Sequence, residues 1–517
     1  MPSYLHPGVY IEEIPSGSRA IEGVSTSTAA FVGTPFRGPA NTPTLIGTWE
    51  EYISQFGDYA QSSGVQDEDD HMALAVRAFY QNGGKAAYIC RVLDSNPAPV
   101  AASVVLQDST PADVMTVTAS SEGDWGEALR VAVAVDGTRF DLHVGTEVAG
   151  DFVAIASEVF RGLSMNPTDD NFVEKVINAS SNLIRVAVED GVTALPVANT
   201  QNADGDFTNF STLVGGSESG PVADDYLNFY NNVLRKFRDV SIMVLPGQQW
   251  PDDGSSNDFI TNTITHCEAT MSRVVIVDPP ADTELETGND VTSLSLPTST
   301  YSVLYYPWVA VSNPLYHVDS NPTASKTMNI PPSAIAAAMW AKIDSKRGVW
   351  KAPAGVETRI NVSGLQYNVE DLEQDGLNPA GVNCIRNRPG FGPVFWGART
   401  LATRADPEWR YVPVRRTAIY IEQSIYNGIQ WAVFEPNDHP LWGALRANIG
   451  SFMDGLFRAG AFQGATAKDA YFVRCGLGDT MTQGDIDRGQ VIVIVGFAPL
   501  KPAEFVIVRI QQKVGEQ

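Results

Sequence analysis

Histidine is the side chain best suited to acid–base or metal chemistry at neutral pH, and this chain has six of them. They are isolated from one another in the sequence, at His6, His71, His143, His266, His317 and His439. The chain has no HExxH metal motif, and Gly83-Gly84-Lys85 lacks the upstream glycine of a phosphate-binding loop. The glycine-rich segment 215–220 lacks the serine spacing of a nucleophile elbow. We therefore expect no catalytic, cofactor-binding or metal-binding site, although tertiary contacts can unite residues that no linear motif connects.

Asp278 stands where an α/β enzyme could use a carboxylate. It ends the apolar run 273–277, which is typical of a buried parallel strand. Ligand sites in α/β folds lie beyond the carboxyl ends of such strands. An aspartate here more often starts a turn, which Pro279-Pro280 would continue. An α/β hydrolase-like enzyme built around Asp278 is therefore an alternative.

The acidic run 67–70 and the four cysteines favour structural roles. Acidic side chains stabilise a helix N-terminus, and the run precedes a predicted helix over 72–81 that ends at Asn82-Gly83-Gly84. The run lacks the alternating oxygen ligands of a calcium loop. Since the cysteines form no CxxC pair and have apolar neighbours, we expect buried free thiols at Cys90, Cys267, Cys384 and Cys475.

Length and charge limit the class of protein. At 517 residues the chain is too long for one core, and domain-size scaling predicts roughly three or four units. The net charge of −25 disfavours nucleic acid as a partner, because a duplex would be repelled. No apolar run approaches the ~20 residues that cross a bilayer, so we expect no direct membrane insertion. The N-terminus shows no secretory signal pattern, which predicts a product that remains in the cytoplasm until something other than a signal peptide exports it.

The order of predicted elements indicates an α/β architecture with an insertion. Residues 26–93 follow a strand, helix, strand pattern. From Asp94 to about Thr212, alternating apolar residues predict a mostly antiparallel inserted domain. The apolar runs 241–247 and 273–278 predict buried parallel strands, separated by a helix that contains 259–271.

Two more helices are predicted in the second half. The first spans 333–346, between Pro332-Ser333 and Arg347-Gly348. The second spans 441–457, with Asp438 or His439 as its cap and Pro440 in its first turn. Its apolar residues form one stripe at helical spacing, with Arg446 and Asp454 off it: Leu441, Leu445, Ile449, Phe452 and Leu456.

Both ends of the chain are predicted to be strands. Residues 9–14 and 505–510 are short, rich in β-branched residues and bounded by prolines, which detach the second strand from the apolar run 491–497. Such strands pair within their own chain, fray, or offer their unpaired N–H and C=O groups to another molecule.

A series of motifs follows in order through the second half: Tyr305-Tyr306-Pro307-Trp308-Val309, Ile330-Pro331-Pro332-Ser333, 347–355, 377–383, 394–400, 408–416, 430–438 and 498–505. With these motifs the chain resembles the contractile tail sheath family of bacteriophages and related contractile injection systems. The opening residues 7–13 and Phe31-Val32-Gly33 also fit, and 123–126 and 163–167 resemble the outer domain of phage-type sheaths. One departure is Phe391, where many relatives carry an arginine.

The resemblance implies an α/β (α+β) multidomain fold. Residues 25–94 and 301–498 would form a mixed α/β core sheath domain. Residues 95–214 would form a mostly β outer domain, and 215–300 a middle α/β domain. The remaining segments, 1–24 and 499–517, would be extended strand arms.

The resemblance also implies a structural subunit without catalysis or cofactor. Such subunits polymerise as stacked hexameric rings around an inner tube and contract from a metastable extended state, which drives the tube through a target envelope. The expected partners are further copies of the chain, the inner tube protein, and baseplate and tail-terminator proteins, in a virion tail or a contractile injection particle. A static surface-layer protein is the second alternative.

The family's assembly assigns roles to particular residues. Arms in relatives join the sheets of neighbouring subunits, which implies strand donation by Val9, Tyr10, Ile11, Glu12, Phe505, Val506, Ile507, Val508, Arg509 and Ile510. The helix over 441–457 matches the tube-facing helix of relatives, which implies tube contacts at Arg446 and Asn448 opposite the apolar stripe. The arginine cluster, with Arg399, Arg415 and Arg416, forms either internal salt bridges or contacts between subunits.

Overall fold

The computed structural model describes residues 20–57, 70–319, 321–505 and 507. The chain divides into two compact units, which are described separately below. The larger unit spans Ser25–Arg416, and the smaller unit combines Met1–Val24 with Thr417–Gln517.

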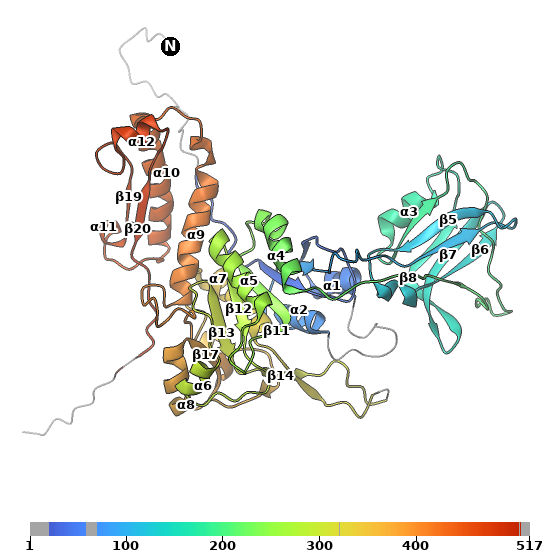
Figure 1. Cartoon of the computed structure of the whole chain (residues 1–517), viewed down its shortest axis with the longest axis horizontal. Coiled ribbons are helices and arrows are strands. Elements are labelled where there is room, and N and C mark those ends of the chain that lie inside the picture. The colour runs from blue at the N-terminus through green and yellow to red at the C-terminus, as the bar shows by residue number, and fades with distance from the viewer. Residues whose placement is uncertain (1–19, 58–69, 320, 506, 508–517) are drawn as a thin grey trace, which may run out of the picture. The chain divides into compact units, whose positions relative to one another are not determined.

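An eight-stranded sheet forms the centre of the larger unit (Figure 1). Its order is β18-β17-β13-β12-β11-β1-β3-β2, parallel from β17 to β3 and antiparallel at both edges. The strands are β1 (Ala29–Gly33), β2 (Thr44–Ile46), β3 (Ala87–Arg91), β11 (Ile242–Gln249), β12 (Val274–Asp278), β13 (Ser302–Tyr306), β17 (Val382–Arg388) and β18 (Gly392–Phe395). Every residue of β1, β12 and β13 is buried, as expected for strands covered on both faces. The mixed α/β class predicted from the sequence is confirmed.

Helices pack on this sheet in pairs. α2 packs on α7 and α4 packs on α5, and both α5 and α7 contact β11 and β12. The side chains of Thr48 and Asp70 cap α1 and α2, and the cap at Asp70 confirms the helix start predicted after the acidic run 67–70. The helices of this unit are α1 (Trp49–Phe56), α2 (His71–Gln81), α3 (Val173–Ser180), α4 (Ala223–Asn232), α5 (Asp258–Thr270), α6 (Gly288–Ser293), α7 (Ser333–Arg347) and α8 (Asp371–Leu377).

Two segments that the resemblance assigns to different domains contribute strands to one sheet. β11 and β12, from the predicted middle domain 215–300, lie between β1 and β13 in one continuous sheet. Apolar parallel strands need hydrogen-bonding neighbours on both sides, and here the neighbours come from both flanking segments. Residues from Thr417 onward belong to the smaller compact unit, and the domain bounds 301–498 stay a prediction.

The segment between β3 and α4 forms two antiparallel sheets over a core of its own. One sheet has the order β10-β6-β7-β8 and the other β4-β5-β9, and Val131, Leu142 and Ile184 are fully buried between them. The strands are β4 (Ser103–Gln107), β5 (Asp113–Ala119), β6 (Arg130–Asp136), β7 (Arg139–Val148), β8 (Asp151–Leu163), β9 (Ile184–Val188) and β10 (Ser211–Thr212).

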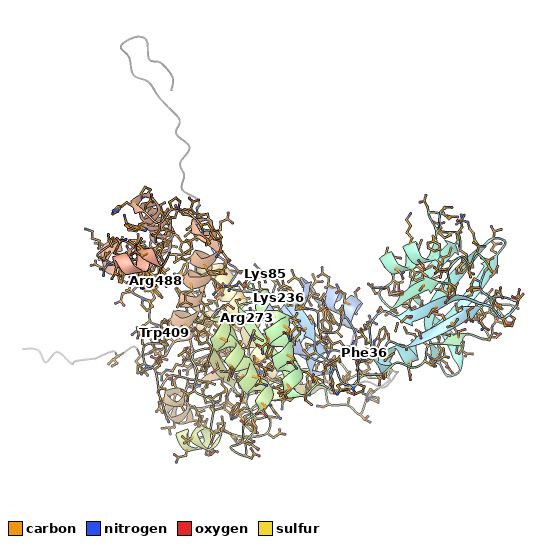
Figure 2. All side chains as sticks on the ribbon, turned by 45° about the horizontal axis from the view of Figure 1, so that its top comes forward. Phe36, Lys85, Lys236, Arg273, Trp409 and Arg488 are labelled. Carbon is orange, nitrogen blue, oxygen red and sulfur yellow. The ribbon has the colours of Figure 1, made fainter. Side chains whose placement is uncertain are left out.

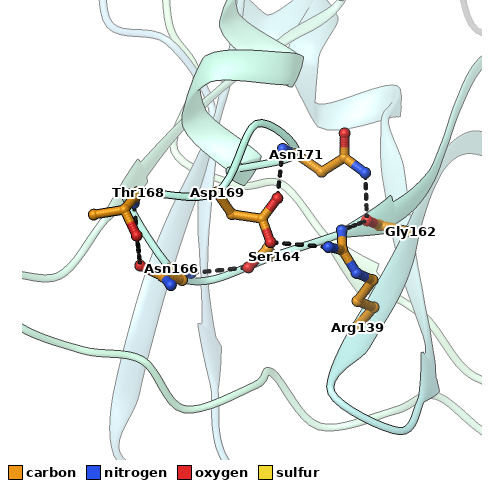
Figure 3. A network of polar contacts seen from close by, with 7 residues as sticks. All are labelled: Arg139, Gly162, Ser164, Asn166, Thr168, Asp169 and Asn171. Carbon is orange, nitrogen blue, oxygen red and sulfur yellow. Dashed lines mark hydrogen bonds and ion pairs between the residues drawn. The ribbon is translucent and has the colours of Figure 1, made fainter.

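A polar network holds the loop that follows β8 (Figure 3). Arg139 donates to the Gly162 carbonyl (2.8 Å) and to the Asp169 carboxylate (2.9 Å). The Asn171 backbone N–H also donates to Asp169 and, with Arg139, lowers the pKa of that carboxyl. These groups satisfy one another, so the network explains the shape of the loop without a ligand.

Two arginines connect this inserted segment to the central sheet. Arg91 at the end of β3 is fully buried, donates to the carbonyls of Gly38 (2.9 Å) and Glu122 (2.8 Å), and pairs with Glu218. Arg37 lies over the Trp125 ring at 5.6 Å. The preceding residue, Phe36, labelled in Figure 2, packs against the core of the insertion.

The remaining elements are a small sheet and the smaller unit. The small sheet has the order β15-β14-β16 and comprises β14 (Val309–Ser312), β15 (Thr327–Ile330) and β16 (Gly364–Leu365).

Helix α9 (Val412–Gly428) continues into the smaller unit, where Val24 N donates to Ser424 Oγ (3.1 Å). The other elements there are α10 (His439–Arg458), α11 (Ala467–Ala470), β19 (Tyr471–Arg474), α12 (Gln483–Asp487) and β20 (Ile494–Phe497).

Candidate assembly surface

Helix α10 carries the predicted inner-tube contact, and its sequence explains where it begins. The Asp438 carboxylate accepts a hydrogen bond from Leu441 N (3.2 Å), and Pro440 lies in the first turn. The predicted apolar stripe is confirmed, with Phe452 half-buried and the other four members buried: Leu441, Leu445, Ile449 and Leu456.

The two predicted tube-contact residues lie on different faces of α10. Arg446 is exposed, and its Nη1 donates to the Cys475 carbonyl. Asn448 is only 4% exposed, and its Nδ2 has no hydrogen-bond partner within the part of the chain that the structure describes. Because Asn448 lies three residues after Leu445 and seven after Leu441, helical periodicity places it on the apolar stripe. Of the two residues, only Arg446 is presented to a partner.

Strands β19 and β20 form a two-stranded antiparallel sheet beside α10. Tyr471 pairs with Phe497, and Arg474 pairs with Ile494. The inner face packs on α10, where Tyr471 Oη donates to the Gly450 carbonyl (3.3 Å). The outer face presents Phe472 and Ile494, which are 49% and 43% exposed. No third strand pairs with this sheet among the described residues, and a two-stranded sheet is marginally stable by itself.

The predicted strand arms fall mostly outside the described residues. This holds for Val9, Tyr10, Ile11, Glu12, Val506, Val508, Arg509 and Ile510. The two described members, Phe505 and Ile507, are 75% and 80% exposed and belong to no strand. Strand donation by both arms therefore stays a prediction.

The arginine cluster makes contacts inside the subunit. Arg416 pairs with Asp344 at 2.6 Å, and both side chains are 4% exposed. Arg415 lies 3.7 Å over the ring of Trp409, which Figure 2 labels. Arg399 donates to the Asn378 carbonyl (3.0 Å). All three arginines are buried, so the structure favours the internal alternative over contacts between subunits.

Asp278 is a buried helix cap. Its carboxylate accepts hydrogen bonds from Ser333 N (2.9 Å) and Ser333 Oγ (2.6 Å), at the first residue of α7. A carboxylate at a helix N-terminus meets unpaired N–H groups and the positive end of the helix dipole. Burial nevertheless raises the pKa of Asp278 to about 7. The carboxylate is 2% exposed, so it is not open to a substrate in this form.

His266 and the four cysteines are buried in the structure and have structural roles. Burial and, to a smaller extent, the neighbouring Arg273 together lower the pKa of His266 to about 3. All four cysteines are free and buried, as predicted. Within residues 20–57, 70–319 and 321–505, no three His, Cys, Asp or Glu side chains are grouped so that they could hold a metal ion. In the described part of the chain, no helix is both long and apolar enough to span a membrane.

Comparisons with known proteins place this architecture in a family. A model of the phage tail sheath protein central domain matches residues 220–401, and one of the phage tail sheath C-terminal domain matches 404–513. The tail sheath protein of Burkholderia phage BcepMu is 24% identical over 479 residues, which cover 90% of this chain and 89% of that protein. The two domain models together match more than half of the chain. The chain belongs to the contractile tail sheath family, which is a family of structural proteins.

Solved structures show the same fold. The sheath of the PVC extracellular contractile injection system, in its contracted state, matches with a TM-score of 0.58 and 24% identity and covers 99% of both chains. The helical sheath of the anti-feeding prophage, also contracted, matches with a TM-score of 0.57 and 23% identity, covering 99% of this chain and all of that one.

Proposed function

We propose that this chain polymerises as stacked six-membered rings around an inner tube and shortens from a metastable extended lattice to a compact one, which drives the tube through a target envelope. The observation that carries the proposal is the β19–β20 sheet. Among the described residues no further strand pairs with it, and only the chain just beyond β20 is bridged, from Pro499 to Phe462. An unpaired edge is a template for a strand from another molecule. The sequence supplies two candidate strands, at residues 9–14 and 505–510.

Strand exchange explains how a lattice can shorten without coming apart. Each net backbone hydrogen bond contributes only about 1 kcal/mol, but an arm makes several, and every subunit repeats them. The arms keep neighbours connected while the rigid bodies rotate and slide, so the linkers act as hinges. The free-energy difference between the two lattices supplies the work, and no nucleotide is needed.

The proposed partners are further copies of the chain, the inner tube protein, and baseplate and tail-terminator proteins. Arg446 is the residue on α10 that we assign to the tube contact, because it is the exposed member of the predicted pair. Subunits would assemble in the bacterial cytoplasm and become part of a virion tail or an injection particle.

Electron microscopy of two matched double variants tests the strand arms. Val9→Pro with Ile11→Pro removes two backbone donors and blocks strand pairing, whereas Val9→Thr with Ile11→Thr keeps β-branched side chains. We expect folded subunits without contractile cylinders from the proline variant, and striated cylinders of two lengths from the threonine variant. Normal contractile cylinders from the proline variant would contradict the proposal, and cylinders of one fixed length from the unmodified chain would favour a static surface layer.

A further inference from the structure

The turn between α9 and α10 presents an aromatic side chain in a strained conformation. Glu435 N donates to the Ala432 carbonyl (3.3 Å), which closes a four-residue turn. Val433 has φ −70° and ψ 130°, and Phe434 has φ +70°. These angles define a type II turn with Phe434 at the position that requires positive φ, where glycine or asparagine is favoured. A bulky residue there is an outlier that costs free energy.

Nothing in the described part of the chain offsets that cost. The Phe434 side chain is fully exposed, and Val433 beside it is 60% exposed. An exposed phenylalanine gains no burial, so it is less favourable here than glycine would be in both conformation and solvation. A contact with another molecule would supply the burial that Phe434 lacks here.

The turn is held rigidly on both sides. Trp431 and Ala432 pack against the cluster of Leu441, Trp442, Leu445, Cys475 and Met481. On the other side, Asn437 accepts a hydrogen bond from Trp442 Nε1 (2.8 Å) and donates to the Gln490 carbonyl (3.0 Å). Because the backbone on both sides of Phe434 is fixed, the turn loses little backbone entropy on binding, which is a property of a preformed anchor.

We propose that Phe434 inserts against the outer face of the β19–β20 sheet of another copy of this chain. That face carries Phe472 and Ile494, together with Arg474, which pairs with Ile494 across the two strands and whose guanidinium is held by Asp479. Gly496 opposite Phe472 adds no side chain of its own, and the Phe472 ring covers its backbone. The Phe472 ring and the Ile494 side chain therefore form the apolar part of this face.

Both halves of this contact belong to one chain, which is why we commit to a second copy. Because Phe434 is fully exposed, it does not rest on its own Phe472 and Ile494. A projecting residue and a receiving surface at different places on one molecule make a head-to-tail contact, and such contacts build rings or helical filaments. The contact rests on the proposed sheath assembly and adds to it: arms would occupy the edges of the sheet, and Phe434 its outer face.

Cysteine cross-linking tests the contact directly. The natural cysteines are all buried, so oxidation should select engineered surface thiols. In assembled full-length Phe434→Cys/Ile494→Cys, we expect a ladder of disulfide-linked multimers on a non-reducing gel. Assembled material that stays monomeric after oxidation would overturn the proposal. With tube protein carrying a surface cysteine present, a disulfide from Phe434→Cys to the tube in place of the ladder would also overturn it.

A glycine substitution separates this contact from folding. Phe434→Gly suits the type II turn, so we expect a higher melting temperature, together with a rise of about tenfold or more in the concentration needed for assembly. Leu372→Ala is the matched control, because Leu372 is 84% exposed on α8 of the larger unit and should leave assembly unchanged. Unchanged assembly of Phe434→Gly would overturn the contact alone. Failure of the unmodified chain to assemble would overturn the proposed function and the contact together.

Discussion

The central sheet of the larger unit and the β19–β20 sheet of the smaller unit treat their edges differently. At one end of the eight-stranded sheet, β2 has three residues, and at the other end, Ile360 N donates to Pro393 of β18 (3.1 Å). Short or covered edges prevent pairing with other chains. Among the described residues, no further strand pairs with β19 or β20, a single bridge from Pro499 to Phe462 follows the end of β20, and Phe472 is exposed. The central sheet is therefore protected from pairing with other chains. The β19–β20 sheet is open to such pairing, and we call it the connector.

Among the described residues, the buried ion pairs lie in the larger unit, which also carries exposed pairs such as Arg347–Glu357. In the larger unit, Arg416 and Asp344 are both buried, and Arg91 is buried against Glu218. In the smaller unit, the pairs Arg458–Asp454 and Arg488–Asp485 lie mostly in solvent. Buried pairs depend strictly on their partners, whereas exposed pairs contribute little. Breaking a buried pair of the larger unit should therefore lower folding stability, whereas breaking an exposed pair in either unit should cost little.

The largest expected effect is loss of the buried ion pair. Asp344→Ala leaves Arg416 buried without its partner, which should lower the free energy of unfolding by about 3–5 kcal/mol. The exposed pair Arg347–Glu357 provides the control, and Glu357→Ala should cost no more than about 1 kcal/mol. Denaturant unfolding of both variants measures the difference. Equal losses of unfolding free energy would mean that burial does not determine how much each pair contributes to stability.

A smaller effect is expected in the pH dependence of stability. Because burial raises the pKa of Asp278 from 3.8 to about 7, the folded chain holds a proton that the unfolded chain has released between these values. Stability contributed by this group therefore falls as pH rises through that window, by at most about 1.4 kcal/mol per pH unit. Asp278→Asn should flatten this slope in unfolding titrations between pH 4 and 7. An unchanged slope would remove Asp278 as its source.

The smallest effect on stability is expected for Arg446 on α10 of the smaller unit. Arg446→Glu loses one hydrogen bond to the Cys475 carbonyl, so unfolding should change by about 1 kcal/mol or less. Sedimentation with preformed inner tubes should nevertheless show weaker assembly, and Arg446→Lys, which keeps the charge, should restore most of it. Assembly of Arg446→Glu at the level of the unmodified chain would place the tube contact elsewhere.

Local signals in the sequence predicted local structure well. The cap at Asp438, Pro440 in the first turn and the stripe from Leu441 to Leu456 were sufficient to define α10. Asp70 likewise predicted the start of α2. In each case the deciding interactions lie within one or two helical turns, which is the range that side-chain pattern and capping chemistry cover.

Properties that depend on distant partners were not predictable in this way. The position of β11 and β12 inside the central sheet results from pairing with strands more than 20 residues away along the chain. The burial of Arg416 depends on Asp344, and no local pattern distinguishes it from a surface arginine. The sequence did not indicate a type II turn at Phe434, because such turns favour glycine at that position. The burial of Asn448, in contrast, could have been predicted from its helical spacing to the apolar stripe.

Hydrogen–deuterium exchange of the free and assembled chain tests the difference between the central sheet and the connector most directly. We predict that assembly slows exchange of the amides in Tyr471–Arg474 and Ile494–Phe497, because donated strands pair with the open edges. Amides of β12 and β13 should exchange slowly and equally in both states. Unchanged exchange in β19 and β20 on assembly would contradict strand donation to this sheet.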